Sequence, residues 1–242
     1  MSIAITTLLF VATSLSAIIS AVSGMGGGIV LLSIMTFFLP LSTLIPIHGV
    51  VQLMSNISRT WLLRESVIKN IFLWFALGLP IGTFISIKII QSIENKIILF
   101  SLIAALIFYS IFKPKKLPEL RIPSYCFLFV GVSVGILGPL IGATGPTIAP
   151  FFMREDFSKE QIIATKSSVQ VIGHLIKIPT FLYLGFNYLD HAFLIIALVV
   201  AAILGTHLGV KILTRVNDKT FRIVFKSALF LAGVRIVYKV LT

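Results

Sequence analysis

The stretch Ser23-Gly24-Met25-Gly26-Gly27-Gly28 interrupts an apolar run that extends from Ser2 to Leu39. As a single helix this run would be about 57 Å long at about 1.5 Å per residue, and a bilayer's hydrocarbon core is only about 30 Å thick. Glycine tolerates positive φ and has no side chain to shield its backbone. The sequence therefore predicts that the helix breaks between Gly24 and Gly28 and then restarts.

The composition indicates an all-α integral membrane protein. Of 242 residues, 57% are hydrophobic and 12% are charged, with a mean hydropathy of +1.08, whereas soluble domains carry roughly 25% charged residues. This leaves no room for a sizeable soluble domain, and we expect about eight crossings. Apolar stretches of spanning length lie at roughly 3–22, 43–63, 67–90, 96–112, 160–184, 190–213 and 219–240, with an interrupted stretch at 124–153.

The net charge of +12 does not indicate nucleic acid binding, because most basic residues lie at predicted helix ends or in the connector around Lys113 to Arg121. Such loops set topology and contact lipid headgroups. The basic residues are too evenly divided between alternate loops to orient the chain. Cys126 is the only cysteine, so it forms no internal disulfide and no thiolate metal site by itself. We expect no metal and no cofactor. Residues 1–22 lack a basic leader and are interpreted as a retained span rather than a cleaved signal peptide.

The two halves of the chain resemble each other at an offset of 118 residues. At this offset Gly24 and Gly27 match Gly142 and Gly145, and with five extra residues in the second half the register resumes, so that Gly82-Thr83 matches Gly205-Thr206. We predict two homologous four-helix repeats, at 1–112 and 124–242, joined by a basic linker at 113–123. The first helix of each repeat would be broken by a Gly/Pro-rich segment. The sequence leaves open whether the repeats are parallel or inverted.

The second break, Gly142-Ala143-Thr144-Gly145-Pro146, follows Pro139 and contains Pro146, and both prolines disfavour helix just before them. Each restarted helix would present unpaired N–H groups and the positive end of its dipole, which together suit an anion. The alternative is that these glycines only let helices pack closely. We predict that packing role for three other pairs, namely Gly78-x-x-x-Gly82, Gly131-x-x-x-Gly135 and Gly205-x-x-x-Gly209.

Each half also carries a polar stripe on one helix face, spaced at offsets of 4, 8 and 11 residues. The residues are His48, Gln52, Asn56 and Arg59 in the first half, and Lys166, Gln170, His174 and Lys177 in the second. A charge at the bilayer centre costs about 3 kcal/mol, so such groups usually face a bundle interior or a cavity. Two simpler roles stay open. The glutamines can hydrogen-bond between helices, and Arg59 and Lys177 can extend to the membrane interface.

The chain's carboxylates favour a small anion as substrate, because all eight fall in or beside predicted loops. They are Glu65, Glu94, Glu119, Glu155, Asp156, Glu160, Asp190 and Asp218. No acid within a span would then hold a cation, whereas lysine, arginine, histidine and amides line the stripes. Proton coupling would fall to His48 or His174, since histidine titrates near neutral pH.

The Gly-rich break at Ser23 to Gly28, its echo from Gly138 to Pro146 and the duplicated compact unit resemble the sulfite exporter TauE/SafE permeases. The resemblance covers nearly the whole chain. It implies an eight-helix, cofactor-free permease for sulfite, organosulfonates or related sulfur oxyanions, usually exporting them from a bacterial cell. The second break departs from the first, because Thr144 and Pro146 stand where the first has Gly26 and Gly28.

We therefore expect a multi-pass permease of the bacterial inner (plasma) membrane, working by alternating access as one repeat rocks against the other. Its partners would be a small anionic substrate and membrane lipid, with a homodimer possible and no nucleic acid. The alternatives are an intramembrane scaffold or subunit without transport, or an intramembrane hydrolase with Ser23 or Thr144 beside a histidine. The predicted substrate-binding residues are Gly24, Gly26, Gly27, Gly28, His48, Gln52, Asn56, Arg59, Gly142, Thr144, Gly145, Lys166, Gln170, His174 and Lys177.

Overall fold

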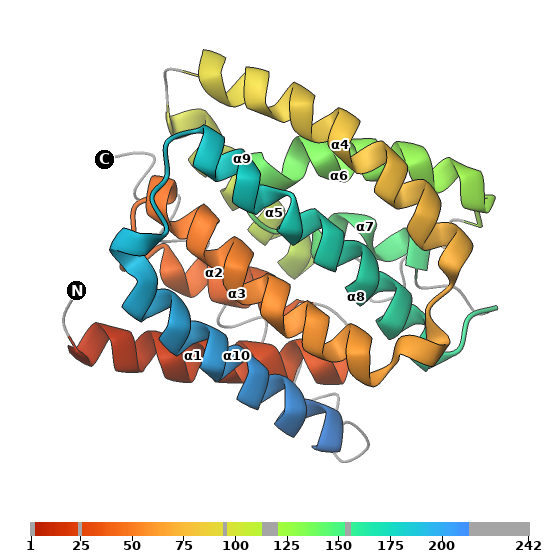
Figure 1. The fold of residues 1–242 in the computed structure, drawn as a ribbon, viewed down its shortest axis with the longest axis horizontal. Helices are drawn as coiled ribbons and strands as arrows, with labels where there is room; N and C mark the ends of the chain where they lie inside the picture. The colour runs from red at the N-terminus through yellow and green to blue at the C-terminus, as the bar shows by residue number, and fades with distance from the viewer. Residues whose placement is uncertain (1–2, 24–25, 94–95, 113–120, 153–155, 213–242) are drawn as a thin grey trace.

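The computed structural model describes residues 3–23, 26–93, 96–112, 121–152 and 156–212, and these residues form helices joined by short connections (Figure 1). The helices are α1 (Ile3–Ser23), α2 (Gly27–Met35), α3 (Leu41–Leu62), α4 (Lys69–Ser92), α5 (Lys96–Phe112), α6 (Phe127–Ile141), α7 (Gly145–Phe152), α8 (Lys159–Leu175), α9 (Lys177–Tyr183) and α10 (Ala192–Ile212). Short 3-10 turns lie at η1 (Arg64–Ser66), η2 (Ser124–Cys126) and η3 (Leu189–His191). Most described helices lie within the predicted apolar stretches, but the stretch at 160–184 is divided into α8 and α9 at Ile176. The stretch at 219–240 lies outside the described residues.

Both predicted breaks are present. The helix α1 ends at Ser23 and α2 restarts at Gly27, after Gly26 with φ of 93°. The second break follows Gly142, whose φ is 77°, and α7 restarts at Gly145. Pro146 lies in the first turn of α7, where a missing N–H is tolerated.

Pro139, in contrast, does not disrupt the helix just before it, although the sequence led us to expect a disruption. The helix α6 continues through Pro139 to Ile141. The residue is buried, and apolar helices tolerate proline where neighbouring segments surround the freed backbone group.

The helices pack in pairs that bring distant parts of the chain together. The helix α1 packs along α10, and α4 packs along α6. Between these two pairs lies a central pair, α3 with α8, continued by α9 (Figure 1). Each of the three pairs joins one helix of the first half to one of the second half, so the halves interleave.

Close packing at the three glycine pairs is confirmed. A Cβ atom on Gly78 or Gly82 would collide with the backbone carbonyls of Leu128 or Val132, so α4 and α6 meet backbone to backbone. Gly131 and Gly135 make the reciprocal approach from α6 toward α4. On the other side of the molecule Gly205 meets the carbonyl of Ser14, and Gly209 packs against the adjoining turn of α1.

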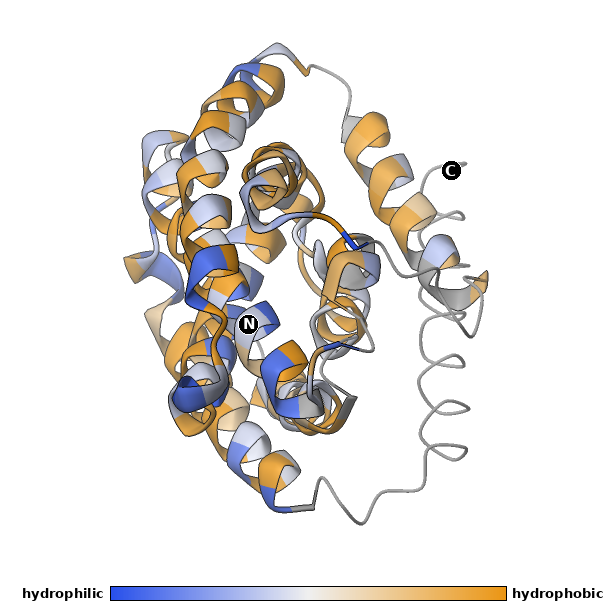
Figure 2. Ribbon diagram, turned by 90° about the vertical axis from the view of Figure 1, so that its right-hand side faces the viewer, coloured by the Kyte–Doolittle hydropathy of each residue, from blue (hydrophilic) through white to orange (hydrophobic). Residues whose placement is uncertain are grey.

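Four segments in the described part of the chain are long and apolar enough to cross a membrane: Ile3–Val22, Lys69–Ser92, Ser124–Ile141 and Leu189–Lys211. Their outward faces expose large apolar side chains, such as Leu77 on α4 and Leu204 on α10. In Figure 2 the helices are mostly orange, and hydrophilic blue is limited to single turns and helix ends. The helix α3, with 22 residues, has the length for a crossing, but its polar stripe lowers its hydropathy.

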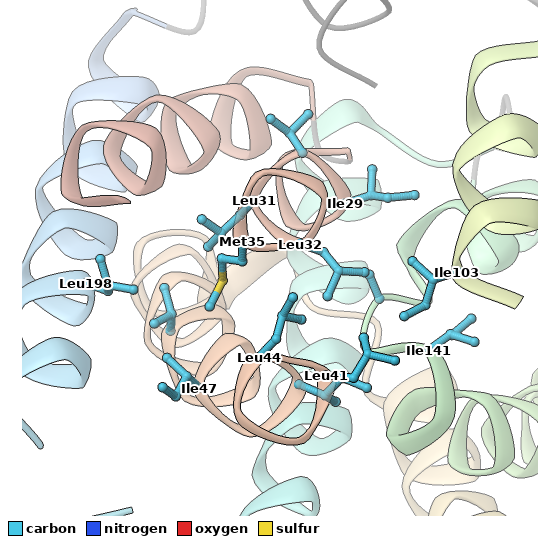
Figure 3. Packing of buried hydrophobic residues seen from close by; sticks show 14 of the residues in the cluster. Ile29, Leu31, Leu32, Met35, Leu41, Leu44, Ile47, Ile103, Ile141 and Leu198 are labelled. Atoms are coloured by element: carbon cyan, nitrogen blue, oxygen red, sulfur yellow. The ribbon is translucent and has the colours of Figure 1, made fainter. Parts of the chain in front are cut away.

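The restarted helix α2 is embedded in the larger hydrophobic core. Its side chains Ile29, Leu32 and Met35 lie among residues from α3, α5, α6 and α10 (Figure 3). This burial fixes the position of the α2 N-terminus inside the molecule, beside the central helix pair.

Candidate functional site

A cavity inside the molecule is lined by residues from both breaks and both polar stripes. The lining residues are Ser20, Gly26, Gly28, Ile29, His48, Gln52, Asn56, Arg59, Ala143, Gly145, Gln170 and His174. Its volume, counted as space for the centre of a water molecule, is about 20 Å³. That is enough for roughly one water. A second, smaller cavity adjoins it, since Gln170 and His174 line both, and Thr144 and Lys177 also line this second one.

The two glutamines of the stripes lie against the two restarted helices. A Cβ atom on Gly28 would lie 3.1 Å from Oε1 of Gln52, and one on Gly145 would lie 3.3 Å from Nε2 of Gln170. Glycine at these positions lets an amide side chain approach the first turn of each helix. The two breaks therefore face the same cavity from two sides.

His48 is hydrogen-bonded to the backbone of the first break. Its Nε2 lies 2.8 Å from the carbonyl oxygen of Gly28. Because a carbonyl can only accept, Nε2 carries the hydrogen and donates it. The other ring nitrogen, Nδ1, is buried and has no hydrogen-bond partner in the described structure.

Arg59 is a buried cation held by hydroxyl groups. Its side chain donates from Nη2 to Ser55 Oγ at 3.1 Å and from Nη1 to Ser167 Oγ at 3.4 Å, and Nε has no partner among the described residues. The residue is 2% exposed, so the alternative that Arg59 extends to the membrane interface was wrong. Ser55 in turn lies 2.9 Å from the hydroxyl of Thr206.

The described carboxylates lie away from this cation. Glu65, Asp156, Glu160 and Asp190 are all exposed, and Glu65 pairs with Arg64 at the surface. None of the described carboxylates therefore pairs with Arg59.

Lys177 is also buried, but it is bonded differently. Its Nζ donates to the carbonyl oxygen of Gly142 at 2.7 Å and to Nδ1 of His174 at 3.4 Å. The aliphatic part of the Lys177 side chain packs against two glycines. A Cβ atom added to Gly49 would lie 3.6 Å from Cδ of Lys177, and one added to Gly138 would lie 3.3 Å from Cε of Lys177. The residue is 3% exposed, so it does not extend to the interface either. The Gly142 carbonyl follows the C-terminus of α6, where a helix dipole favours positive charge.

The two stripes meet at a pair of histidines. The rings of His48 and His174 lie edge to face, with centroids 6.0 Å apart. Asn56 completes this side of the cavity: its Nδ2 donates to the Gln52 carbonyl at 2.8 Å, and its Oδ1 has no partner in the described structure.

Other predicted residues lie outside the larger cavity. Lys166 is 1% exposed but lines neither cavity. Gly27 packs against the Ser16 carbonyl and the Ser20 hydroxyl of α1, and a side chain on Gly142 would point at Leu32. Gly24 lies outside the described residues.

The sequence-based prediction missed the hydroxyls that hold Arg59. Ser55 lies four residues before Arg59, one helical turn away, and that spacing was a usable signal. Ser167 and Thr206 belong to other helices, and no local pattern connects them to Arg59.

Comparison with known families agrees with the resemblance drawn from the sequence. The family model of the sulfite exporter TauE/SafE matches residues 9–236. No curated protein and no solved structure matches the chain. The chain therefore belongs to the sulfite exporter TauE/SafE family, and this membership makes it a membrane transporter of sulfur compounds.

Proposed function

We propose that this TauE/SafE protein carries a small sulfur oxyanion across the membrane by alternating access, through a site between two homologous four-helix repeats. The substrate is sulfite, an organosulfonate or a related anion. The protein is a multi-pass protein of a bacterial inner membrane, and its partners are the anion and the surrounding lipid. A homodimer would use surfaces other than the three glycine pairs, because these are occupied within the chain.

The observation that carries this proposal is the position of Arg59. Its guanidinium lines a cavity that both helix restarts also line, and the described carboxylates all lie at the surface. A buried cation held only by neutral hydroxyls is costly without a counter-charge. An oxyanion would provide that charge, and its oxygens would accept hydrogen bonds from the guanidinium and from the amides of Gln52 and Gln170.

A repeated contact supports the two-repeat architecture. Gly82 on α4 meets the carbonyl of Val132 on α6, and Gly205 on α10 meets the carbonyl of Ser14 on α1. The register read from the sequence matches Gly82 to Gly205 and places Val132 118 residues after Ser14. One glycine-to-carbonyl contact is thus made twice at matched positions, as a duplicated unit with interleaved halves would make it.

The size of the cavity supports a moving site. Its volume of about 20 Å³ holds roughly one water, whereas sulfite has four heavy atoms. The described conformation is therefore too narrow for the proposed anion. Admitting an anion requires the helices around the cavity to separate, and alternating access provides such a movement.

Thermal stabilisation of the purified protein tests the proposal. Sulfite, thiosulfate, sulfoacetate, sulfate, phosphate and chloride are compared at matched ionic strength. We expect a selective rise in melting temperature with one sulfur oxyanion, lost in Gln52→Ala and in Gln170→Ala. Gln91→Ala, which removes an exposed glutamine from α4, is the matched control and should keep the shift.

Flux into liposomes then separates a carrier from a scaffold. A carrier gives saturable uptake and exchanges internal for external anion, whereas a scaffold or subunit without transport gives neither. Absence of both a thermal shift and flux for all six anions would overturn the proposal.

A further inference from the structure

We infer that each anion binds together with one proton, and that Nδ1 of His48 accepts this proton. The inference rests on the proposed function and adds the ion that is coupled to it. It comes from the hydrogen bonds of the two histidines that meet between the stripes.

The hydrogen bonds of His48 leave one ring nitrogen free to accept. Its Nε2 donates to the Gly28 carbonyl at 2.8 Å, so in the neutral ring Nδ1 holds a lone pair. This atom is buried, has no partner in the described structure, and belongs to a residue that lines the cavity. A proton taken up there turns an acceptor into a donor beside the anion site.

His174 has no such free nitrogen. Its Nδ1 lies 3.4 Å from Nζ of Lys177, and an ammonium group can only donate. The lone pair of Nδ1 is therefore used, and in the neutral ring Nε2 carries the hydrogen. Although the two rings lie edge to face with centroids 6.0 Å apart, they are not equivalent as proton acceptors.

The charged groups around His48 determine when the proton binds. Arg59 lies on the same helix, Lys166 and His174 lie on α8, and Lys177 lies at the start of α9. The helix α2 contributes no titratable group, and His207 and Lys211 of α10 are exposed. All of these neighbours are basic, so a proton on His48 would lie near other positive charges and would have no anion beside it until the substrate binds.

A bound anion removes this opposition, and the two ligands then favour each other. The proton adds a hydrogen bond and a positive charge for the anion, while the anion compensates the charge on the ring. Such coupling is reciprocal by thermodynamic necessity. When the site is open to one side of the membrane, Nδ1 of His48 takes up a proton. The resulting N–H donates a hydrogen bond to the anion while the site is closed. When the site opens to the other side, the proton is released to water.

The pH dependence of anion affinity tests this inference. Thiosulfate is the probe, because its charge stays constant between about pH 6 and 8, the range in which histidine titrates. Uptake of one proton per anion predicts that affinity falls about tenfold for each unit of rising pH. In His48→Gln the amide nitrogen can still donate to the Gly28 carbonyl but nothing at this position titrates, so affinity should become independent of pH.

Two further variants assign the effect to one histidine. His174→Asn retains an acceptor oxygen for Lys177, and we expect the pH slope to persist whatever the absolute affinity. His207→Gln, which removes an exposed histidine from α10, should also keep the slope. In liposomes, an inward proton gradient should accelerate thiosulfate uptake by the wild type, and this acceleration should be absent in His48→Gln.

The possible failures are distinguishable. A pH slope that survives in His48→Gln, or that disappears only in His174→Asn, overturns the assignment to His48. If the affinity of the wild type for thiosulfate does not change with pH, proton coupling is overturned but the proposed anion transport is not. If no anion binds the wild type at any pH, the proposed function itself fails, and this inference fails with it.

Discussion

The ammonium group of Lys177 donates to the carbonyl oxygen of Gly142 at 2.7 Å and so ties the start of α9 to the end of α6. Arg59, at the matching position of the other stripe, contacts only hydroxyl oxygens in the described structure. The two buried cations therefore differ in role. Lys177 bonds to the backbone of the second break, whereas Arg59 is the cation that we propose binds the anion.

Arg59→Met should have opposite effects on stability and on binding. Replacing a buried, uncompensated charge by an apolar side chain of similar length should raise the unfolding free energy of the anion-free protein by about 1–4 kcal/mol. The variant should also lose the stabilisation that the anion gives. Thermal unfolding with and without anion measures both effects, and an unchanged anion shift would remove Arg59 from the site.

Lys177→Met should lower the stability of the anion-free protein. The Gly142 carbonyl and Nδ1 of His174 would lose their donor, at a cost of about 1–3 kcal/mol for a buried acceptor. We expect a smaller loss of anion binding than in Arg59→Met. The same unfolding measurement checks this prediction, and a stabilised variant would show that the charge on Lys177 is also uncompensated.

Gly82→Ala should destabilise the protein strongly. The new Cβ would collide with the Val132 carbonyl, and overpacking of this kind costs about 1–3 kcal/mol. Gly173→Ala is the matched control on α8, because a Cβ there would lie 4.0 Å from Val134. Alanine also favours helix over glycine by about 1 kcal/mol, so the control should be neutral or slightly stabilising. Equal losses of melting temperature would contradict the backbone contact between α4 and α6.

Gly28→Ala should reduce anion affinity more than stability. The added Cβ would lie 3.1 Å from the end of the Gln52 side chain, which can move but would then occupy the cavity. Gly49→Ala, on the same central helix as Gln52, places its Cβ at an ordinary 3.6 Å from Lys177 and should bind normally. Titration of both variants with thiosulfate gives the comparison. Wild-type affinity in Gly28→Ala would exclude the α2 restart from the binding site.

Much of the architecture could be predicted from the sequence because local rules control it. Apolar runs of spanning length predicted the helices, and the Gly-rich segments predicted both breaks, where Gly26 and Gly142 adopt positive φ. Periodicity also placed Gln52 and Gln170 on faces that the structure brings to one cavity.

The burial depth of each polar side chain and the residues packed against it could not be predicted by such local rules. Helix phase shows which face a side chain occupies, but it does not show what packs against that face. Lys166 and His48 hold matching stripe positions, yet only His48 lines the cavity. The bonding of Arg59 depends on Ser167, which is distant in the sequence. The bonding of Lys177 depends on Gly142 and on the space beside Gly49 and Gly138, which are also distant in the sequence.

The backbone contacts at Gly82 and Gly205 determine which parts of the protein can move as rigid units. Each contact joins a helix of the first half of the chain to a helix of the second half, with no side chain between them to adjust. Separating the two halves as rigid blocks would break both contacts at once. If the helices around the cavity separate, we expect α1 to stay with α10 and α4 to stay with α6, on either side of the central helices α3 and α8.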